Sequence, residues 1–121
     1  MTPPAGHRGS GPQISVFAAA DAGRRPPAGL TPDIVVTMTS ADCKLETGFY
    51  AVGPEHEEYV GDGYENDEFC YILTGSVVVT ATNGRVATIG PGDSVSIPRG
   101  WLGRWDSEGY TKLWVIYYAN R

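Results

Sequence analysis

The sequence predicts an all-β fold, a single small antiparallel β-barrel. Short β-branched or alternating segments follow one another closely, with turns rich in glycine or proline between them. No stretch of about 11 residues or more has the apolar period of a helix. The 16 glycines of the chain suit many tight turns and bent strands. A length of 121 residues leaves room for one such domain with a modest core.

The first part of the chain differs from the rest. Residues 1–32 are rich in proline, glycine and alanine, with Pro-Pro pairs at 3–4 and 26–27. Such a segment buries too little apolar surface to offset the entropy of ordering it. We therefore expect a flexible arm at 1–32, partly disordered or swapped between subunits, and a barrel domain at 33–121. Within the arm, Ile14–Phe17 is expected to pair with a sheet edge or a neighbouring subunit.

Eight strands are expected within the barrel domain. Asn83-Gly84 gives the strongest hairpin signal, because both residues tolerate positive φ. Gly90-Pro91-Gly92-Asp93 marks another turn. The expected strands are Ile34–Thr39, Leu45–Val52, Glu68–Leu73, Ser76–Thr82, Arg85–Ile89, Ser94–Ile97, Gly103–Asp106 and Lys112–Tyr118.

Two segments resemble the sequence motifs of the cupin superfamily. Residues 68–75 match the glutamate-to-glycine half of the first motif, and residues 92–100 match the second motif as far as its Pro-x-Gly. Over about residues 33–118 the chain also resembles small single-domain cupins related to the ureidoglycine aminohydrolase cupin domain. The resemblance implies a jelly-roll barrel with an interior pocket, and it suggests a homodimer. The residues that carry it are Glu68, Cys70, Tyr71, Leu73, Gly75, Gly92, Asp93, Pro98, Gly100, Trp105 and Lys112.

The chain departs from the cupin pattern at the metal ligands. The paired histidines of the first motif fall on Asp62 and Tyr64, and the histidine of the second falls on Gly103. Only Glu68 keeps its ligand type. A tight zinc, iron or nickel site is not expected without imidazoles or thiolates, so the sequence predicts no metal and no cofactor. A weaker alternative is a hard divalent cation held by Asp62, Tyr64 and Glu68.

Strand alternation predicts which side chains enter the barrel. If Glu68 points inward, so does Cys70, because side chains alternate along a strand. The resulting pocket has an aromatic wall and a few convergent polar groups, as small-molecule sites do. Lys112 is expected to face a surface carboxylate, and His56 to lie in a solvated acidic loop. The expected substrate-binding residues are Tyr50, Asp62, Asn66, Cys70, Trp101, Arg104 and Trp105.

Three functions remain open for such a pocket. Glu68 and Tyr64 are the candidate catalytic residues of an enzyme that uses acid–base chemistry, as a lyase, isomerase or hydrolase. The second hypothesis is a module that binds or senses a metabolite without transforming it. The third is metal-dependent chemistry like that of the ureidoglycine relatives. For Cys70, a nucleophile and a buried core thiol are both considered.

Composition limits the partners. The net charge is −5 and the basic residues form no cluster, which argues against nucleic acid or an anionic membrane surface. No apolar run reaches the roughly 18 residues of a membrane span. The two cysteines are too few for a disulfide framework. We expect a cytoplasmic protein with reduced thiols and a small-molecule partner.

Overall fold

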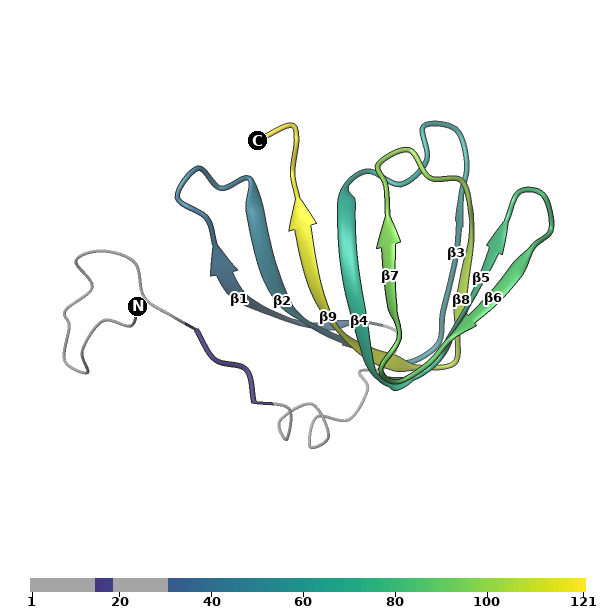
Figure 1. Ribbon diagram of the computed structural model, residues 1–121, viewed down its shortest axis with the longest axis horizontal. Helices are drawn as coiled ribbons and strands as arrows, with labels where there is room; N and C mark the ends of the chain where they lie inside the picture. Colours follow the sequence, from purple (N-terminus) through teal and green to yellow (C-terminus); the bar gives the residue numbers. More distant parts are fainter. Residues whose placement is uncertain (1–14, 19–30) are drawn as a thin grey trace.

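The computed structural model describes residues 15–18 and 31–121 (Figure 1). The described residues form nine antiparallel strands in two facing sheets. Five strands pair in the order β1-β2-β9-β4-β7, and four pair in the order β3-β8-β5-β6. The two sheets come together at one end and spread apart at the other (Figure 1). In chain order the strands are β1 (Asp33–Thr39), β2 (Leu45–Val52), β3 (Glu55–Tyr59), β4 (Asp67–Gly75), β5 (Val77–Ala81), β6 (Val86–Ile89), β7 (Ser94–Ile97), β8 (Gly103–Ser107) and β9 (Tyr110–Tyr117).

This architecture confirms the predicted all-β jelly roll and adds one strand to it. The eight expected strands appear with small shifts at their ends. The additional strand is β3, which pairs with β8 where the sequence suggested a solvated acidic loop. Charged side chains do not prevent a strand when alternate positions point outward, and they do so here. Within the described residues, no helix is long and apolar enough to cross a membrane.

The hairpin at Asn83-Gly84 is present, but its geometry differs from the expectation. Among the described residues other than glycine, only Cys43 has a positive φ, so Asn83 does not adopt the left-handed conformation. Gly84 alone does, with φ of 86°. The backbone amide of Ala81 donates to the carbonyl of Arg85, which closes a three-residue loop. Three-residue loops of this kind need one left-handed residue, not two.

The main core lies between the two sheets, and a smaller cluster lies on the outer face of the five-stranded sheet. In the smaller cluster, Phe17 stacks on Phe49 with ring centroids 4.6 Å apart. Residues 15–18 form no strand, so for these residues the expected pairing with a sheet edge is wrong. The rest of the predicted arm, 1–14 and 19–30, falls outside the described residues. The buried residues of the main core are Val52, Cys70, Ile72, Val77, Ile89, Ile97, Trp105 and Tyr110.

A glycine in β2 permits the close packing of the indole that borders the core. Gly48 lies opposite Trp114 of β9 in the ladder. A Cβ at position 48 would lie 2.3 Å from the Trp114 ring and 2.3 Å from the Val35 carbonyl oxygen. Both contacts are far inside van der Waals range, and one partner is backbone. The absence of a side chain at Gly48 therefore sets the position of Trp114.

We expect Gly48→Ala to lower the free energy of unfolding by about 1–3 kcal/mol, because an extra methyl group overpacks this site. Gly90→Ala is the matched control, since a Cβ at Gly90 meets nothing within 4 Å. The control should stay within about 0.5 kcal/mol of the wild type. Urea unfolding of both variants measures the difference, and equal stability of the two would contradict the packing argument.

Candidate functional site

A cavity of about 270 Å³ lies between the sheets. It is bordered by inward-facing residues of β1, β2, β3, β4, β7, β8 and β9 and by Tyr64 and Tyr118 outside the strands. Its size is close to the lower end of the range for small-molecule pockets. The lining residues are Ile34, Val36, Glu46, Tyr50, Glu55, Tyr59, Tyr64, Glu68, Ile97, Trp105, Tyr110, Lys112, Trp114, Ile116 and Tyr118.

A buried ion pair in the cavity wall joins β4 and β9, two neighbouring strands of the five-stranded sheet. Lys112 Nζ donates to Glu68 Oε2 at 2.7 Å. Their side chains are only 9% and 2% exposed, so bulk water does little to screen the pair. In the β4–β9 ladder, Lys112 lies opposite Ile72, four residues along β4 from Glu68. The lysine side chain thus extends along β4 and passes Cys70, whose Sγ lies 3.9 Å from Nζ.

Tyr64 completes the first polar cluster. Its hydroxyl donates to Glu68 Oε1, so both carboxylate oxygens of Glu68 accept a hydrogen bond from the protein. Tyr64 lies in the loop between β3 and β4. Backbone hydrogen bonds from Tyr64 N to Trp101 O and from Gly100 N to Tyr64 O hold this loop against the segment before β8. A Cβ at Gly63 would lie 2.4 Å from the Gly100 carbonyl oxygen, so this close approach requires glycine.

Aromatic rings surround the Lys112 ammonium. Its Nζ lies 5.0 Å from the ring centroid of Tyr50, 5.4 Å from that of Trp105 and 5.8 Å from that of Tyr110. These distances fall within the range of cation–π attraction. Burial alone would lower the pKa of Lys112, but the adjacent Glu68 carboxylate outweighs it, and the pKa is raised above its usual value. The ammonium is therefore charged at neutral pH.

A second polar cluster lies around Glu55 of β3. Tyr50 donates to Glu55 Oε2, and Tyr110 donates to Glu55 Oε1 at 2.5 Å. The indole N–H of Trp105 donates to the Tyr110 hydroxyl oxygen at 3.1 Å. Glu55 thus resembles Glu68 in that both of its oxygens accept protein hydrogen bonds. Lys112 lies between the clusters, since its aromatic neighbours include Tyr50 and Tyr110.

The phenols of the cavity hold their protons firmly. Burial, together with the carboxylate beside each hydroxyl, raises the pKa of Tyr50, Tyr64 and Tyr110 above the usual value. Burial and nearby glutamates raise the pKa of Tyr59 to about 12. A desolvated phenolate next to a carboxylate is unfavourable, which accounts for the common direction. All four phenols are neutral at pH 7.

The structure brings together some of the sequence-predicted site residues and leaves others elsewhere. Glu68, Tyr64, Tyr50 and Trp105 line the cavity together. Cys70 belongs to the core behind the wall, and burial raises the pKa of its thiol to about 12.

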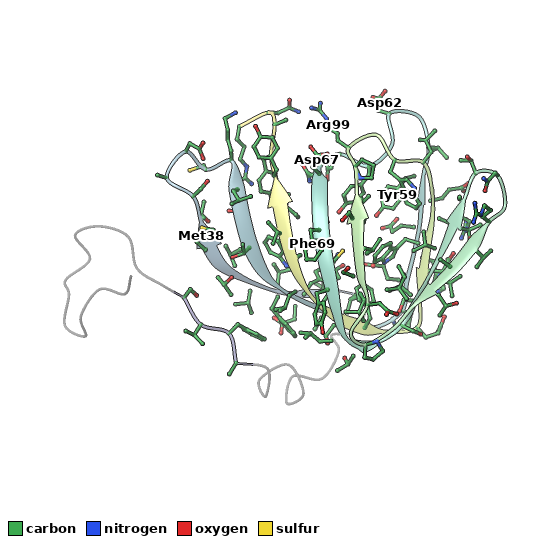
Figure 2. All side chains as sticks on the ribbon, viewed as in Figure 1. Met38, Tyr59, Asp62, Asp67, Phe69 and Arg99 are labelled. Carbon is green, nitrogen blue, oxygen red and sulfur yellow. The ribbon has the colours of Figure 1, made fainter. Side chains whose placement is uncertain are left out.

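Four other residues expected in the pocket do not line it. Asp62 is exposed in a turn at the rim (Figure 2), and Asn66 is half-buried outside the lining. Trp101 lies behind Tyr59, with ring centroids 5.9 Å apart. Arg104 is on the outer face of β8. The reason for the first two is that residues 60–66 form turns and bends, so the strand alternation of β4 does not extend back through them.

Eleven lining residues were not identified from the sequence, and five of them are the polar or aromatic ones on β3 and β9. The expectation that Lys112 faces a surface carboxylate is wrong, because it pairs with a buried one. The sequence did contain a signal, because alternation along β9 places Lys112 on the same face as Trp114 and Ile116. In β3 the same rule separates inward Glu55 and Tyr59 from outward His56. The five residues are Glu55, Tyr59, Tyr110, Lys112 and Trp114.

The cupin resemblance implies a metal centre, and the residues present do not fit one. Glu68, the only retained ligand type, already binds an ammonium and a phenol. Gly103 offers no side chain, and exposed Asp62 does not join the lining with Tyr64 and Glu68. In the described part of the chain, no group of three or more His, Cys, Asp or Glu could hold a metal ion. The alternative oxygen site of Asp62, Tyr64 and Glu68 is therefore not assembled.

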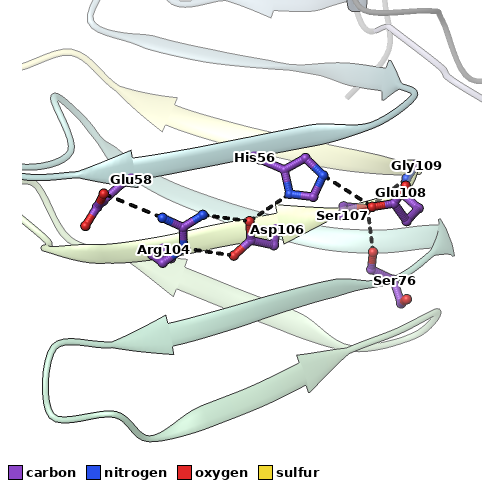
Figure 3. Close-up of polar contacts among 8 residues, drawn as sticks. All are labelled: His56, Glu58, Ser76, Arg104, Asp106, Ser107, Glu108 and Gly109. Carbon is purple, nitrogen blue, oxygen red and sulfur yellow. Dashed lines mark hydrogen bonds and ion pairs between the residues drawn. The ribbon is translucent and has the colours of Figure 1, made fainter.

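Arg104 and His56 belong to a separate charged cluster on the outer face of the four-stranded sheet (Figure 3). His56 Nδ1 lies 2.8 Å from Asp106 Oδ1, and Nε2 lies 3.2 Å from Glu108 Oε2. Arg104 bonds Asp106 and lies 3.5 Å from Glu58. The hydrogen bond to Asp106, aided by the charges of Asp106 and Glu108, raises the pKa of His56. Arg104 is thus paired within this surface and is not at the cavity mouth.

Comparison with known proteins supports the fold. Residues 60–112 match the family model of the EutQ-like cupin domain. A search of curated proteins finds no match. The EutQ protein of Clostridium difficile is 17% identical, with 74% of this chain and 70% of that chain covered and a TM-score of 0.59. A cupin superfamily protein of Desulfitobacterium hafniense is 17% identical, with 80% of this chain and 86% of that chain covered and a TM-score of 0.58. A protein of unknown function from Rhizobium leguminosarum is 22% identical, with 88% of this chain and 98% of that chain covered and a TM-score of 0.62.

The buried ion pair predicts strong coupling between its two partners. Lys112→Met leaves a buried carboxylate without its counter-ion, and Glu68→Gln leaves a buried ammonium. Each should cost about 3–5 kcal/mol of unfolding free energy. The double variant should be more stable than the sum of the single losses by about 1–3 kcal/mol, as urea unfolding of a double-mutant cycle measures. Strict additivity would contradict the coupling.

The surface cluster predicts a pH dependence of stability. Because the pKa of His56 is raised in the folded state, the imidazolium stabilises the fold fully below the unfolded pKa of about 6.5. This contribution is lost as the pH rises through the folded pKa. His56→Gln should therefore lower the melting temperature at pH 5.5–6 more than at pH 8.5. A loss of equal size at both pH values would show that protonation of His56 does not contribute.

Proposed function

We propose that this protein, a member of the cupin superfamily with a EutQ-like cupin segment, binds a small organic molecule in the cavity between its two sheets. The proposal rests on the cavity itself: about 270 Å³ of space with an aromatic wall and convergent polar groups. A domain that only needed stability would gain by filling this space with side chains, because dense packing is favourable.

One observation favours binding over catalysis. Both oxygens of Glu68 and both oxygens of Glu55 accept hydrogen bonds from protein donors. A carboxylate held by protein donors on both oxygens is less available to take a proton from a substrate, and a general acid works best with a pKa close to the working pH. The raised pKa values of Tyr64 and Lys112 keep both groups protonated far above neutrality. The site is built to hold a ligand in a fixed polar environment.

A metal-independent enzyme is the second candidate, and one contact favours it. Tyr64 lines the cavity, and its proton lies on a hydrogen bond to Glu68, which in turn bonds the Lys112 ammonium. A substrate that displaced the Tyr64 hydroxyl would free one oxygen of Glu68 for proton transfer. Lyase, isomerase and hydrolase reactions can use such a carboxylate–phenol pair. Ureidoglycine-type aminohydrolase chemistry is less well supported, since its metal ligands are missing here.

The binding proposal predicts that blocking the cavity mouth releases the ligand. Ile34 lines the cavity and is 55% exposed, so Ile34→Trp fills the mouth without a large change in the core. Val86→Trp is the matched control, because Val86 is 62% exposed and does not line the cavity. Mass spectrometry of small molecules released from denatured protein should find one species with the wild type and the control. Its amount should fall about tenfold or more in Ile34→Trp.

An equal amount of the same molecule in Ile34→Trp, or none in the wild type, would contradict binding in this cavity. The molecule so identified then separates the two candidate functions. Turnover by the wild type, reduced about a hundredfold in Glu68→Gln with binding retained, would establish the enzyme. Binding without turnover supports the module that we propose.

A further inference from the structure

We infer that the cavity selects a small protonated amine, an organic ammonium with a short apolar body, and discriminates against carboxylates and phosphates. This inference deepens the proposed function and rests on it. Three properties of the cavity carry it: the use of its hydrogen-bond donors, the balance of its charges and the nature of its walls.

The hydroxyl donors of both clusters are already used within the wall. A phenol has a single proton, and Tyr50, Tyr64 and Tyr110 each direct theirs to a glutamate. The Trp105 N–H is directed to Tyr110. What these groups still offer a ligand are lone pairs on phenol and carboxylate oxygens, which are acceptors. These groups therefore suit a ligand rich in donors better than one rich in acceptors.

The charges of the cavity also favour a cationic ligand over an anionic one. Its acidic lining residues are Glu46, Glu55 and Glu68, and its basic lining residue is Lys112. Glu46 has an additional partner in Arg121, whose Nη1 lies 3.4 Å away and whose side chain is 43% exposed. With that partner included, three carboxylates face two cations, and the excess is negative. In a cleft partly shielded from bulk water, this excess favours a cation over an anion.

Lys112 does not provide an anion site. Its side chain is 9% exposed, and its ammonium bonds Glu68 directly and lies among three aromatic rings. An incoming carboxylate would have to compete with Glu68 for the same charge while close to that carboxylate. Like charges at such short range are strongly unfavourable in a buried site.

The remaining walls suit a cation with an apolar body. Besides the three rings around Lys112, the aromatic residues Tyr59, Tyr64, Trp114 and Tyr118 line the cavity. The faces of such rings attract an organic ammonium. Aliphatic residues provide apolar contact for the remainder of the ligand, and the volume of about 270 Å³ limits that remainder to a small group. These aliphatic residues are Ile34, Val36, Ile97 and Ile116.

The inference is tested with three probes of matched shape: benzylamine, benzyl alcohol and benzoate. Calorimetric titration of the full chain at pH 7 and at low salt should give the tightest binding for benzylamine. We expect benzyl alcohol to bind about tenfold more weakly and benzoate to bind least of all. The amine should also lose affinity as salt is added, and the alcohol should not.

Two variants assign the preference to the cavity. Glu55→Gln removes one cavity charge and should weaken benzylamine about tenfold while it leaves benzyl alcohol nearly unchanged. Glu108→Gln removes the same charge from an exposed residue outside the cavity, 84% exposed, and should leave both affinities unchanged. If Glu55→Gln does not fold, the order of the three probes on the wild type decides alone.

The outcomes separate this inference from the proposal on which it rests. Benzoate or benzyl alcohol bound as tightly as benzylamine would overturn the amine preference and leave the cavity as a binding site. Binding of none of the three probes, with no loss of co-purified ligand in Ile34→Trp, would overturn both. If Glu108→Gln abolishes the amine preference as fully as Glu55→Gln does, the preference comes from the net charge of the protein and not from this site.

Discussion

The buried pair of Glu68 and Lys112 is the constraint on which the site depends. It connects the neighbouring strands β4 and β9 of the larger sheet, and its charges are almost entirely removed from water. Desolvation of two ions is expensive, and well-packed apolar residues often stabilise a fold as well or better. The pair therefore has a cost in stability. The pair fixes an ammonium beside Glu68 and next to the tyrosines that bond Glu55. This arrangement sets the charge and the hydrogen bonding of the cavity wall.

The surrounding network follows from that arrangement. Glu68 needs a second donor, and Tyr64 supplies it from a loop held by backbone hydrogen bonds and by the small size of Gly63. Lys112 lies against aromatic rings, and two of their hydroxyls satisfy Glu55. A polar network in which each carboxylate oxygen has a partner is rigid and specific. Few hydrogen-bond donors of this network are free, so the ligand that we propose has to supply donors of its own.

The sequence predicted the fold, and its candidates include four of the fifteen residues that line the cavity. The physical reasons for the differences vary. Alternation in β4 correctly placed Glu68 inward, and motif spacing correctly indicated a jelly roll. The same alternation failed for Asp62 and Asn66, because the chain turns before β4 begins. Lys112 and Glu55 were missed for another reason: single charged residues are usually solvated, and only tertiary contacts show which ones are paired inside. The register of β4 on β9 that brings Lys112 to Glu68 is a long-range property that local patterns do not contain.

The ammonium of Lys112 explains how a cupin fold can keep its glutamate and lose its histidines. A metal at this place would supply a positive charge with open coordination positions, which attract anionic and carbonyl oxygens. An ammonium supplies the same charge through N–H donors of short reach, and here Glu68 and aromatic rings already surround it. The protein's own carboxylate therefore balances this positive charge. For the ligand that we propose, the oxygens of Glu55 and of the tyrosine hydroxyls are the acceptors. On our proposal, a lysine in this place gives a pocket for a cationic group, whereas a metal would attract anionic or carbonyl oxygens.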